Sequence, residues 1–363
     1  MKNLIFDQEK LEEFRKKNKL QPFRIKQIYQ EIFKNSNIDF GNCTSLSKEL
    51  RESLDKNFEI LSIKIKEIIE GYESTKFLFE TKNSKTFESV LMYHWHTKNN
   101  GDKKINRITL CVSSQVGCAV ACIFCVTGKL GFLANLLWEE IIGQLLFANN
   151  YIKNKFGKKD DGTYHKVRNI VFMGMGEPLL NYNNVKKSIE IMLGQGYGFS
   201  LSKRHITIST SGIIPGIQKM IDDNIESMLA ISLHAPNQEL REKLVPIGKK
   251  YKLNELIYIL DNYYKKTKNR IFYEYIMIKD MNDLSKNAIE LSKLLKHQNC
   301  HINLIPYNEN PAMPNLQETE TSSIYKFKEI LENNGLTVTV RTNMGREEKS
   351  ACGQLGWENI AKG

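Results

Sequence analysis

Apolar residues follow two alternating patterns from residue 107 onwards. Runs rich in Ile, Val, Leu and Phe, typical of buried strands, occur at 107–112, 169–175, 205–210, 227–234, 270–278, 301–308 and 336–342. Between them, apolar residues recur with helical spacing at 138–156, 185–193, 215–223, 253–266, 284–297 and 322–334. Six strand–helix units in series predict a parallel sheet with right-handed crossovers. We therefore expect an α/β fold, a partial (β/α)6 barrel.

The chain before residue 107 has a different pattern. Helical spacing relates two sets of apolar residues: Ile25, Ile28, Tyr29, Ile32 and Phe33, then Leu46, Leu50, Leu54 and Phe58. Their polar faces are rich in Lys and Arg, which are either simply solvated or face RNA. Residues 76–94 alternate like two antiparallel strands around an Asn-Ser turn, and a polar loop follows. We expect a helical accessory RNA-binding domain at 1–75, a strand pair and linker at 76–100, a core domain at 101–345 and a tail at 346–363.

Composition narrows the classes of protein that fit. The chain has 363 residues, of which 41% are hydrophobic and 26% charged, and this excludes a disordered or collagen-like chain. It shows no apolar run long enough for a membrane span and no apolar signal-peptide segment, so we expect a cytoplasmic protein. The net charge of +11 favours a polyanionic partner such as nucleic acid, although surface lysines alone also explain it.

Three of the seven cysteines are closely spaced. Cys118, Cys122 and Cys125 form the pattern C-x3-C-x2-C. Three thiolates on one loop can bind three irons of a cubane iron–sulfur cluster and leave the fourth iron open for another ligand. A structural zinc site needs four ligands, and no nearby His supplies the fourth. Cys43 and Cys300 are interpreted as structural.

Polar or Gly-rich segments follow five of the predicted strands. They lie at 118–125, 174–178, 209–212, 232–234 and 306–308. In a β/α barrel the carboxyl ends of the strands form the rim of the active site, where core packing alone would place apolar residues. Taken singly, each residue also has a structural interpretation: Cys111 and His234 as core residues, and Glu88 as an exposed strand residue.

The cysteine spacing, with Phe124 before the last Cys, resembles the signature of the radical S-adenosylmethionine (SAM) superfamily. The segment GMGEP resembles that superfamily's GGE-type motif, in which open glycine backbone approaches the methionine part of SAM. Its Glu177 then pairs with the SAM ammonium. Several longer segments resemble the RlmN family: CVSSQVGC, VFMGMGEPLLNY, LSKRHITISTSGIIPGI, SLHAPN, LVPI, HINLIPYN, ACGQL, QPFRIKQIY and FESVLMYH. RlmN proteins are radical SAM methyltransferases that methylate carbon 2 of an adenosine in 23S rRNA and in some tRNAs.

The resemblance implies a role for each matching residue. Cys118, Cys122 and Cys125 would hold a 4Fe–4S cluster together with exchangeable SAM. The positions that match SAM contacts are Gly176, Glu177, Ser209, Ser232, Leu233, His234 and Asn308. Cys352 matches the methyl-carrying cysteine, Cys111 the second catalytic cysteine, and Glu88 the proton-acceptor glutamate. The chain departs from the family at residue 126 and at 346–350, where an Asp-Ile-Asp type stretch is expected.

The chemistry that the resemblance implies uses SAM twice per turnover, because carbon 2 of adenine is not nucleophilic. Cys352 takes a methyl group from one SAM. A second SAM, bound at the open iron, is cleaved to a 5′-deoxyadenosyl radical that removes hydrogen from this methyl group. The carbon radical adds to the base, a base removes the ring proton, and Cys111 and Cys352 form a disulfide as the product leaves.

Three alternatives stay open. Cfr-like proteins methylate carbon 8 of the same rRNA adenosine, although they tend to lack the proline of GEPLLN. Methylthiolation would need a second cluster and more cysteines. A metal-stabilised RNA-binding module would need no SAM. The resemblance further implies an external low-potential electron donor such as flavodoxin or ferredoxin, and we expect a monomer with no membrane contact.

Overall fold

A computed structural model describes residues 2–97, 101, 103–341, 351 and 353–356 of the protein. Its largest sheet has ten strands in the order β14-β13-β12-β11-β10-β9-β6-β5-β4-β3. The parallel strands are β6 (Lys103–Cys111), β9 (Asn169–Phe172), β10 (Ile206–Thr210), β11 (Met228–Ser232), β12 (Ile271–Met277), β13 (Cys300–Pro306) and β14 (Thr337–Val340). They follow one another in chain order, which confirms the predicted α/β fold.

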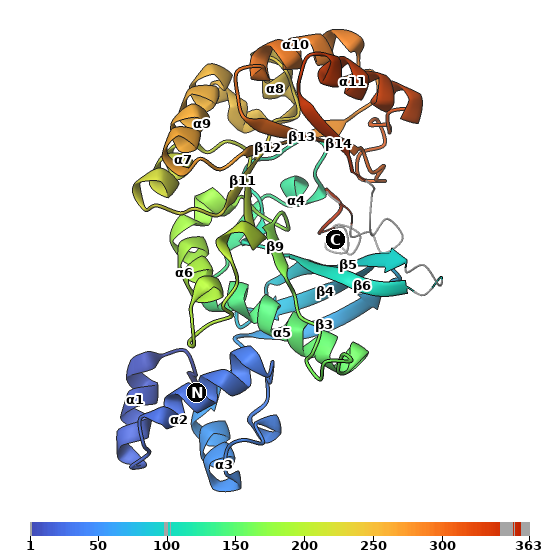
Figure 1. The fold of residues 1–363 in the computed structure, drawn as a ribbon. Helices are drawn as coiled ribbons and strands as arrows, with labels where there is room; N and C mark the ends of the chain where they lie inside the picture. The colour runs from blue at the N-terminus through green and yellow to red at the C-terminus, as the bar shows by residue number, and fades with distance from the viewer. Residues whose placement is uncertain (1, 98–100, 102, 342–350, 352, 357–363) are drawn as a thin grey trace.

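Helices connect these parallel strands. They are α5 (Trp138–Phe156), α6 (Tyr182–Leu193), α7 (Ile214–Asp222), α8 (Gln238–Leu244), α9 (Leu253–Thr267), α10 (Ser285–Leu295) and α11 (Thr321–Asn333). Figure 1 shows the sheet curving, with most of these helices on its outer side. Six of the seven match predicted helices, and α8 was not predicted. In the described residues β14 and β3 form the two edges, so the sheet is open, as a partial barrel requires.

Three antiparallel strands extend the sheet beyond β6. They are β5 (Thr86–Thr97), β4 (Ser74–Thr81) and β3 (Ile63–Glu70). The predicted strand pair at 76–94 is confirmed by the antiparallel pairing of β4 with β5. The loop expected to be a linker lies within the β5–β6 pair, whose register reaches Thr97 opposite Lys103. The strand pair therefore belongs to the same sheet as the core.

Strand β3 corrects one expectation, because residues 63–70 were placed in the helical unit. Its sequence IKIKEIIE exposes nearly every residue, and β3 is an edge strand with a bulge between Ile65 and Glu67. An exposed edge strand has no clean buried–exposed alternation, and its charged side chains discourage pairing with another chain. The helical N-terminal unit therefore ends before Ile63.

The N-terminal unit contains the predicted helices. Its elements are β1 (Asn3–Leu4), α1 (Gln8–Lys17), α2 (Phe23–Tyr29), η1 (Gln30–Lys34), η2 (Phe40–Asn42), α3 (Lys48–Asn57) and β2 (Phe58–Glu59). Asp7 caps α1 by accepting a hydrogen bond from the Lys10 N–H, and Ser47 caps α3 in the same way through the Leu50 N–H. Figure 1 shows this unit beyond α5, away from the inner side of the sheet.

Shorter elements complete the fold. They are β7 (Gln115–Gly117), α4 (Val126–Lys129), β8 (Phe132–Asn135), η3 (Pro178–Asn181), η4 (Lys203–His205) and η5 (Pro246–Lys249). In the part of the chain that the structure describes, no helix is both long and apolar enough to cross a bilayer.

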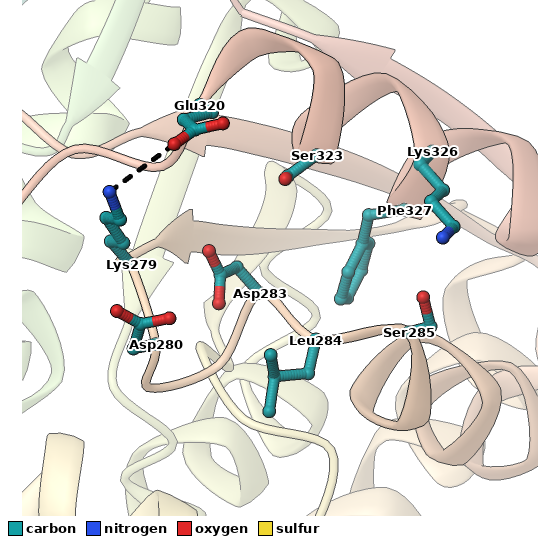
Figure 2. Close-up of a pocket in the computed structure, with 9 residues that line it drawn as sticks. All are labelled: Lys279, Asp280, Asp283, Leu284, Ser285, Glu320, Ser323, Lys326 and Phe327. Carbon is teal, nitrogen blue, oxygen red and sulfur yellow. Dashed lines mark hydrogen bonds and ion pairs between the residues drawn. The ribbon is translucent and has the colours of Figure 1, made fainter.

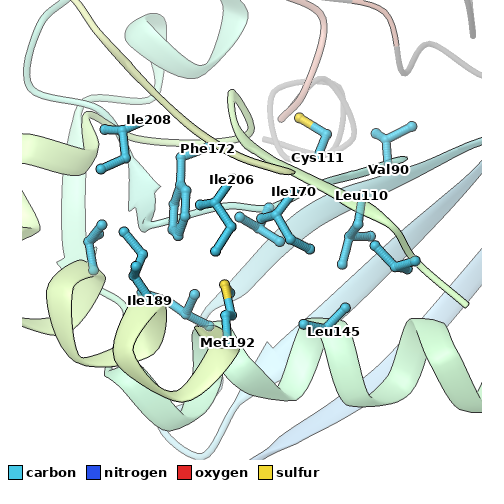
Figure 3. Packing of buried hydrophobic residues seen from close by; sticks show 14 of the residues in the cluster. Val90, Leu110, Cys111, Leu145, Ile170, Phe172, Ile189, Met192, Ile206 and Ile208 are labelled. Carbon is cyan, nitrogen blue, oxygen red and sulfur yellow. The ribbon is translucent and has the colours of Figure 1, made fainter. Parts of the chain in front are cut away.

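The main hydrophobic core lies between the parallel strands and the helices outside them. Figure 3 shows Ile170, Phe172 and Ile206 of the strands above Met192 of α6 and Leu145 of α5. A second, smaller core surrounds the loop of the three cysteines and includes Val120, Phe124, Ala235, Leu244, Val245, Ile276, Ile278 and Tyr307. The candidate site therefore has apolar packing of its own.

Candidate functional site

The loop that carries the three cysteines is held at both ends. It runs from β7 to α4, and β7 pairs with β8 immediately after it. The Cys118 N–H donates to the carbonyl of Gly131 at 2.8 Å, and the Ile123 N–H donates to the carbonyl of Leu244, at the end of α8, at 3.1 Å. These bonds place the loop against the carboxyl ends of the parallel strands.

The three thiols are placed for ligands that carry positive charge. Burial raises the pKa of Cys118 to about 12 and also raises the pKa of Cys122 and Cys125. The nearby backbone N–H groups of Val120 and Ala121 oppose the rise in the pKa of Cys118, and those of Thr127 and Gly128 oppose the rise in the pKa of Cys125. Buried sulfurs that receive N–H groups suit thiolates bound to a cationic centre, as in iron–sulfur proteins.

A cluster and a single metal ion need different sets of ligands. Among the described residues, no group of three or more His, Cys, Asp or Glu side chains could hold a metal ion. Each thiolate of a cubane cluster binds a different iron, so its three cysteines lie further apart than the ligands of one ion. A 4Fe–4S cluster with SAM on its fourth iron needs only three protein thiolates, whereas structural zinc needs four converging ligands.

The GMGEP segment at the end of β9 packs closely on the chain that follows β6. Gly176 has φ +98°, and a Cβ there would lie 2.4 Å from the Gln115 Cβ. A Cβ at Gly174 would lie 2.7 Å from the carbonyl oxygen of Val112. Protein packing thus requires both glycines, and their contact with SAM stays a prediction.

Glu177 joins the ends of β9 and β10. Its Oε1 accepts from the Leu179 N–H at 3.0 Å, and its Oε2 accepts from the Ser211 N–H and hydroxyl, both at 2.7 Å. Burial raises the pKa of Glu177, and the hydrogen bonds from Ser211 oppose that rise. Much of the hydrogen-bonding capacity expected for the SAM ammonium is therefore used by the protein.

The other predicted SAM-contacting residues lie at the carboxyl ends of three more strands. Ser209 is the residue before the last in β10, Ser232 ends β11, and Leu233 and His234 follow it. Asn308 lies two residues after β13 and is buried. Their positions agree with the expected rim, and their contact with SAM stays a prediction.

His234 is packed against the cysteine loop. Its ring lies 4.7 Å from that of Phe124, edge to face, and its Nδ1 accepts from the Ile276 N–H at 3.0 Å. Burial lowers the pKa of His234 to about 3, and the charge of Arg241 adds to this effect. His234 is therefore neutral, and its proton is on Nε2 because Nδ1 is the acceptor.

Arg241 of α8 is a residue of the site that the sequence interpretation missed. Its guanidinium is buried and donates to the carbonyls of Ser232 at 2.9 Å, Leu233 at 2.5 Å and Ser211 at 2.5 Å. These carbonyls follow or end two neighbouring strands, so Arg241 ties the rim together. The sequence contains little signal for it, because α8 has only seven residues, although Arg241 shares one buried face with Leu244 and Val245.

Glu88 and Cys111 lie on adjacent strands. In the β5–β6 register Val90 is opposite Cys111, and the Ser113 hydroxyl donates to the Glu88 carbonyl at 2.5 Å. Figure 3 shows the Cys111 side chain on the opposite side of the sheet from Met192 and the helices. Both predicted catalytic residues are therefore on the inner side of the sheet and both are buried.

A buried lysine accompanies Glu88. The Lys76 Nζ lies 4.0 Å from the Glu88 Oε1, and the side chains are 2% and 1% exposed. A buried carboxylate keeps its charge when such a cation is near. Lys76 was not predicted, because alternation in a strand does not show which polar residue faces an enclosed site.

The described part of the tail lies against the cysteine loop and β5. The Val126 N–H donates to the Gly353 carbonyl at 2.8 Å, and the Thr127 hydroxyl donates to the Leu355 carbonyl at 2.8 Å. The Gly356 N–H donates to the Glu88 Oε2 at 3.0 Å. The predicted methyl-carrying Cys352 lies outside the described residues, as does the 346–350 segment that departs from the family pattern.

A separate pocket of about 230 Å³ lies where the chain leaves β12 and enters α10 and α11. Figure 2 shows the ion pair of Lys279 with Glu320, at 3.4 Å, beside Asp283 at this pocket. None of the predicted site residues lines it. The cysteine loop and the strand ends, rather than this pocket, define the candidate site.

Comparisons with known proteins agree with this geometry. Residues 112–291 match the model of the radical SAM superfamily, and residues 2–60 match that of the ribosomal RNA large subunit methyltransferase N-terminal domain. A probable dual-specificity RNA methyltransferase RlmN from Dictyoglomus turgidum is 41% identical over 92% of this chain and 90% of its own. A protein of the same description from Clostridium novyi is 38% identical over 98% of both chains. The crystal structure of a radical SAM methyltransferase from Sphaerobacter thermophilus is 34% identical, has a TM-score of 0.87 and covers 98% of this chain and 99% of its own.

Proposed function

The chain belongs to the RlmN family of radical SAM RNA methyltransferases, and from this premise we propose that it methylates carbon 2 of an adenosine in 23S rRNA and in tRNA. As a radical SAM enzyme it uses a 4Fe–4S cluster and SAM. Support for the target comes from the N-terminal match at residues 2–60 and from relatives described as dual-specificity enzymes.

The observation that carries the proposal is the docking of the C-terminal segment. Gly353 and Leu355 bind the two residues after Cys125, and Gly356 binds Glu88. These contacts lie just after Cys352 in the sequence, and Ala351 before it is buried. This placement supports a role for Cys352 as the thiol that carries the methyl group next to the cluster.

The residues around this segment then have distinct tasks. With cluster and SAM bound, these cofactors supply the radical that activates the methyl group. Glu88, beside Lys76, accepts the ring proton of the adenine. Cys111, on the strand next to Glu88, forms the disulfide with Cys352 that releases the product.

The backbone around Leu233 and His234 is proposed to contact SAM. Both N–H groups donate to the carbonyl of Glu274, and the Leu233 carbonyl is held by Arg241. The Cys125–Phe124 end of the cysteine loop packs against the neutral His234 ring. These contacts make the rim rigid before SAM binds, which lowers the entropy cost of binding.

The exposed lysines of the N-terminal helices are proposed to bind RNA phosphates. Lys16, Lys17 and Lys19 lie at the end of α1, and Lys26 lies on α2. Such contacts give affinity that depends on salt and little on sequence. An external low-potential donor protein of the flavodoxin or ferredoxin type supplies the electron, and the enzyme acts as a monomer.

The decisive experiment is anaerobic reconstitution with iron, sulfide and SAM, followed by mass spectrometry of nucleosides from treated 23S rRNA and tRNA. We expect 2-methyladenosine in both RNAs. Cys352→Ala should bind the cluster and cleave SAM but leave the RNA unmethylated. Cys300→Ala is the matched control, because Cys300 is buried in the main core away from the rim.

Other results would contradict the proposal and identify a different activity. Methylation at carbon 8 would identify Cfr-like selectivity, and zinc in place of iron with no SAM cleavage would identify an RNA-binding module. Product in 23S rRNA alone would show that tRNA is not a substrate.

A further inference from the structure

Arg241 is one of the most enclosed charged side chains in the site, with 1% of its surface exposed. It lies on α8, whose last residue, Leu244, accepts the Ile123 N–H of the cysteine loop at 3.1 Å. Leu240 and Leu244 pack in the same small core as Cys118, Cys122 and Cys125. Helix α8 and the cysteine loop therefore form one packed unit, with Arg241 inside it.

The hydrogen bonds of Arg241 do not neutralise its charge. Its partners are the backbone carbonyls of Ser211, Ser232 and Leu233, which are neutral dipoles. Within the described residues its Nε has no hydrogen-bond partner, and none of the three groups that its guanidinium binds is a carboxylate. Buried charges in proteins are otherwise paired with an opposite charge or bound to a metal.

The opposite charge is expected at the cysteine loop. A 4Fe–4S cluster with three thiolate ligands is negative overall, and it becomes more negative when it is reduced. We propose that Arg241 is a positioning residue whose buried positive charge balances this cluster and raises its reduction potential. The inference rests on the cluster of the proposed function and assigns a role to a residue outside the cysteine motif.

The step concerned is a one-electron transfer. A low-potential donor protein loses one electron and the cluster gains it, while no bond forms or breaks and no proton moves. A fixed positive charge stabilises the reduced cluster more than the oxidised one, because the reduced form carries the additional negative charge. Nearby charge and exclusion of solvent are among the factors that set the reduction potential of an iron–sulfur cluster.

The test compares Arg241→Gln, Arg241→Met and Arg241→Lys with the wild type after anaerobic reconstitution. The midpoint potential of the cluster is measured by electrochemical titration followed by electron paramagnetic resonance. Both neutral variants should lower the equilibrium constant for reduction at least tenfold, which is about 59 mV for one electron. Arg241→Lys, measured at pH 7, keeps the charge and should stay within a factor of three of the wild type.

Thermal unfolding of the iron-free proteins separates charge from structure. Arg241→Lys should lose stability, because an ammonium cannot reach all three carbonyls, yet keep its potential. If all three variants lower the potential equally, or none does, the inference is wrong. If only Arg241→Lys can be isolated with a cluster, a tenfold loss in that variant overturns it and an unchanged potential supports it. A wild type that assembles no cluster overturns the proposed function instead.

Discussion

Replacing Glu177 with Gln tests whether this residue stabilises the fold or only binds SAM. The carboxylate accepts three hydrogen bonds, one from Leu179 and two from Ser211, at 2.7–3.0 Å. Gln keeps one acceptor oxygen and turns an NH2 group toward an N–H or hydroxyl donor. The change therefore removes at least one hydrogen bond and leaves a buried donor without a partner.

The magnitude follows from these contacts. A hydrogen bond to a charged group contributes about 1.5–3 kcal/mol. Burial, which raises the pKa of Glu177, shows that desolvation of the carboxylate offsets part of this gain. We expect Glu177→Gln to lower the free energy of unfolding by about 2–4 kcal/mol. Ser211→Ala removes only the hydroxyl donor and should cost about 1–2 kcal/mol.

The assay is urea unfolding of the iron-free proteins, without SAM, followed by circular dichroism. A residue that acted only on SAM would leave this transition unchanged and would lower SAM affinity alone. An unfolding midpoint for Glu177→Gln equal to that of the wild type would therefore refute the reasoning. The double variant should cost less than the sum of the single ones, because Glu177 and Ser211 share a bond.

Four further predictions use independent measurements. Cys122→Ala should abolish iron binding and SAM cleavage, and a brown protein with full iron content would disprove the cluster assignment. Alanine at Lys16, Lys17, Lys19 and Lys26 should flatten the salt dependence of RNA binding, by a slope of roughly 0.7–0.9 for each phosphate that these lysines no longer neutralise. Burial lowers the pKa of His94 to about 4, against about 6.5 in the unfolded chain. The folded state therefore favours neutral His94, and the free energy of unfolding should decrease as pH falls from about 6.5 toward 4. Urea titrations at several pH values should show this loss, and His94→Gln should reduce it. Cys111→Ala should accumulate protein crosslinked to RNA through Cys352, detected as a nucleotide-sized mass after nuclease digestion, and normal turnover would exclude the two-cysteine mechanism.

The sequence predicted the parallel strands well, because strands that are buried on both faces appear as continuous apolar runs. Strand β3 was missed for the opposite reason: IKIKEIIE is exposed along nearly its whole length. Helix α8 has only seven residues, which is about two turns and too short for its helical periodicity to stand out from the surrounding sequence. Prediction from pattern therefore succeeded where burial is uniform and failed at the edge of the sheet and in short elements.

The candidate site divides in a similar way. The three cysteines were predicted because their chemistry depends on local spacing, and the rim residues because parallel strands end on one side. Lys76 and Arg241 were missed because charged residues are mostly exposed, and only the tertiary structure buries these two. Glu177 was singled out correctly, but its partners Leu179 and Ser211 depend on how strand ends approach each other.

The docking of the described part of the tail sets few requirements on its side chains. Gly353, Leu355 and Gly356 all bind through main-chain atoms, to Val126, Thr127 and Glu88. Main-chain contacts do not depend on the side chains that precede them. Gly353 has φ +83° and Gly356 has φ +95°, conformations that other residues rarely adopt, so the requirement on sequence falls on these two glycines. A tail held in this way depends on both glycines and on the carboxylate of Glu88.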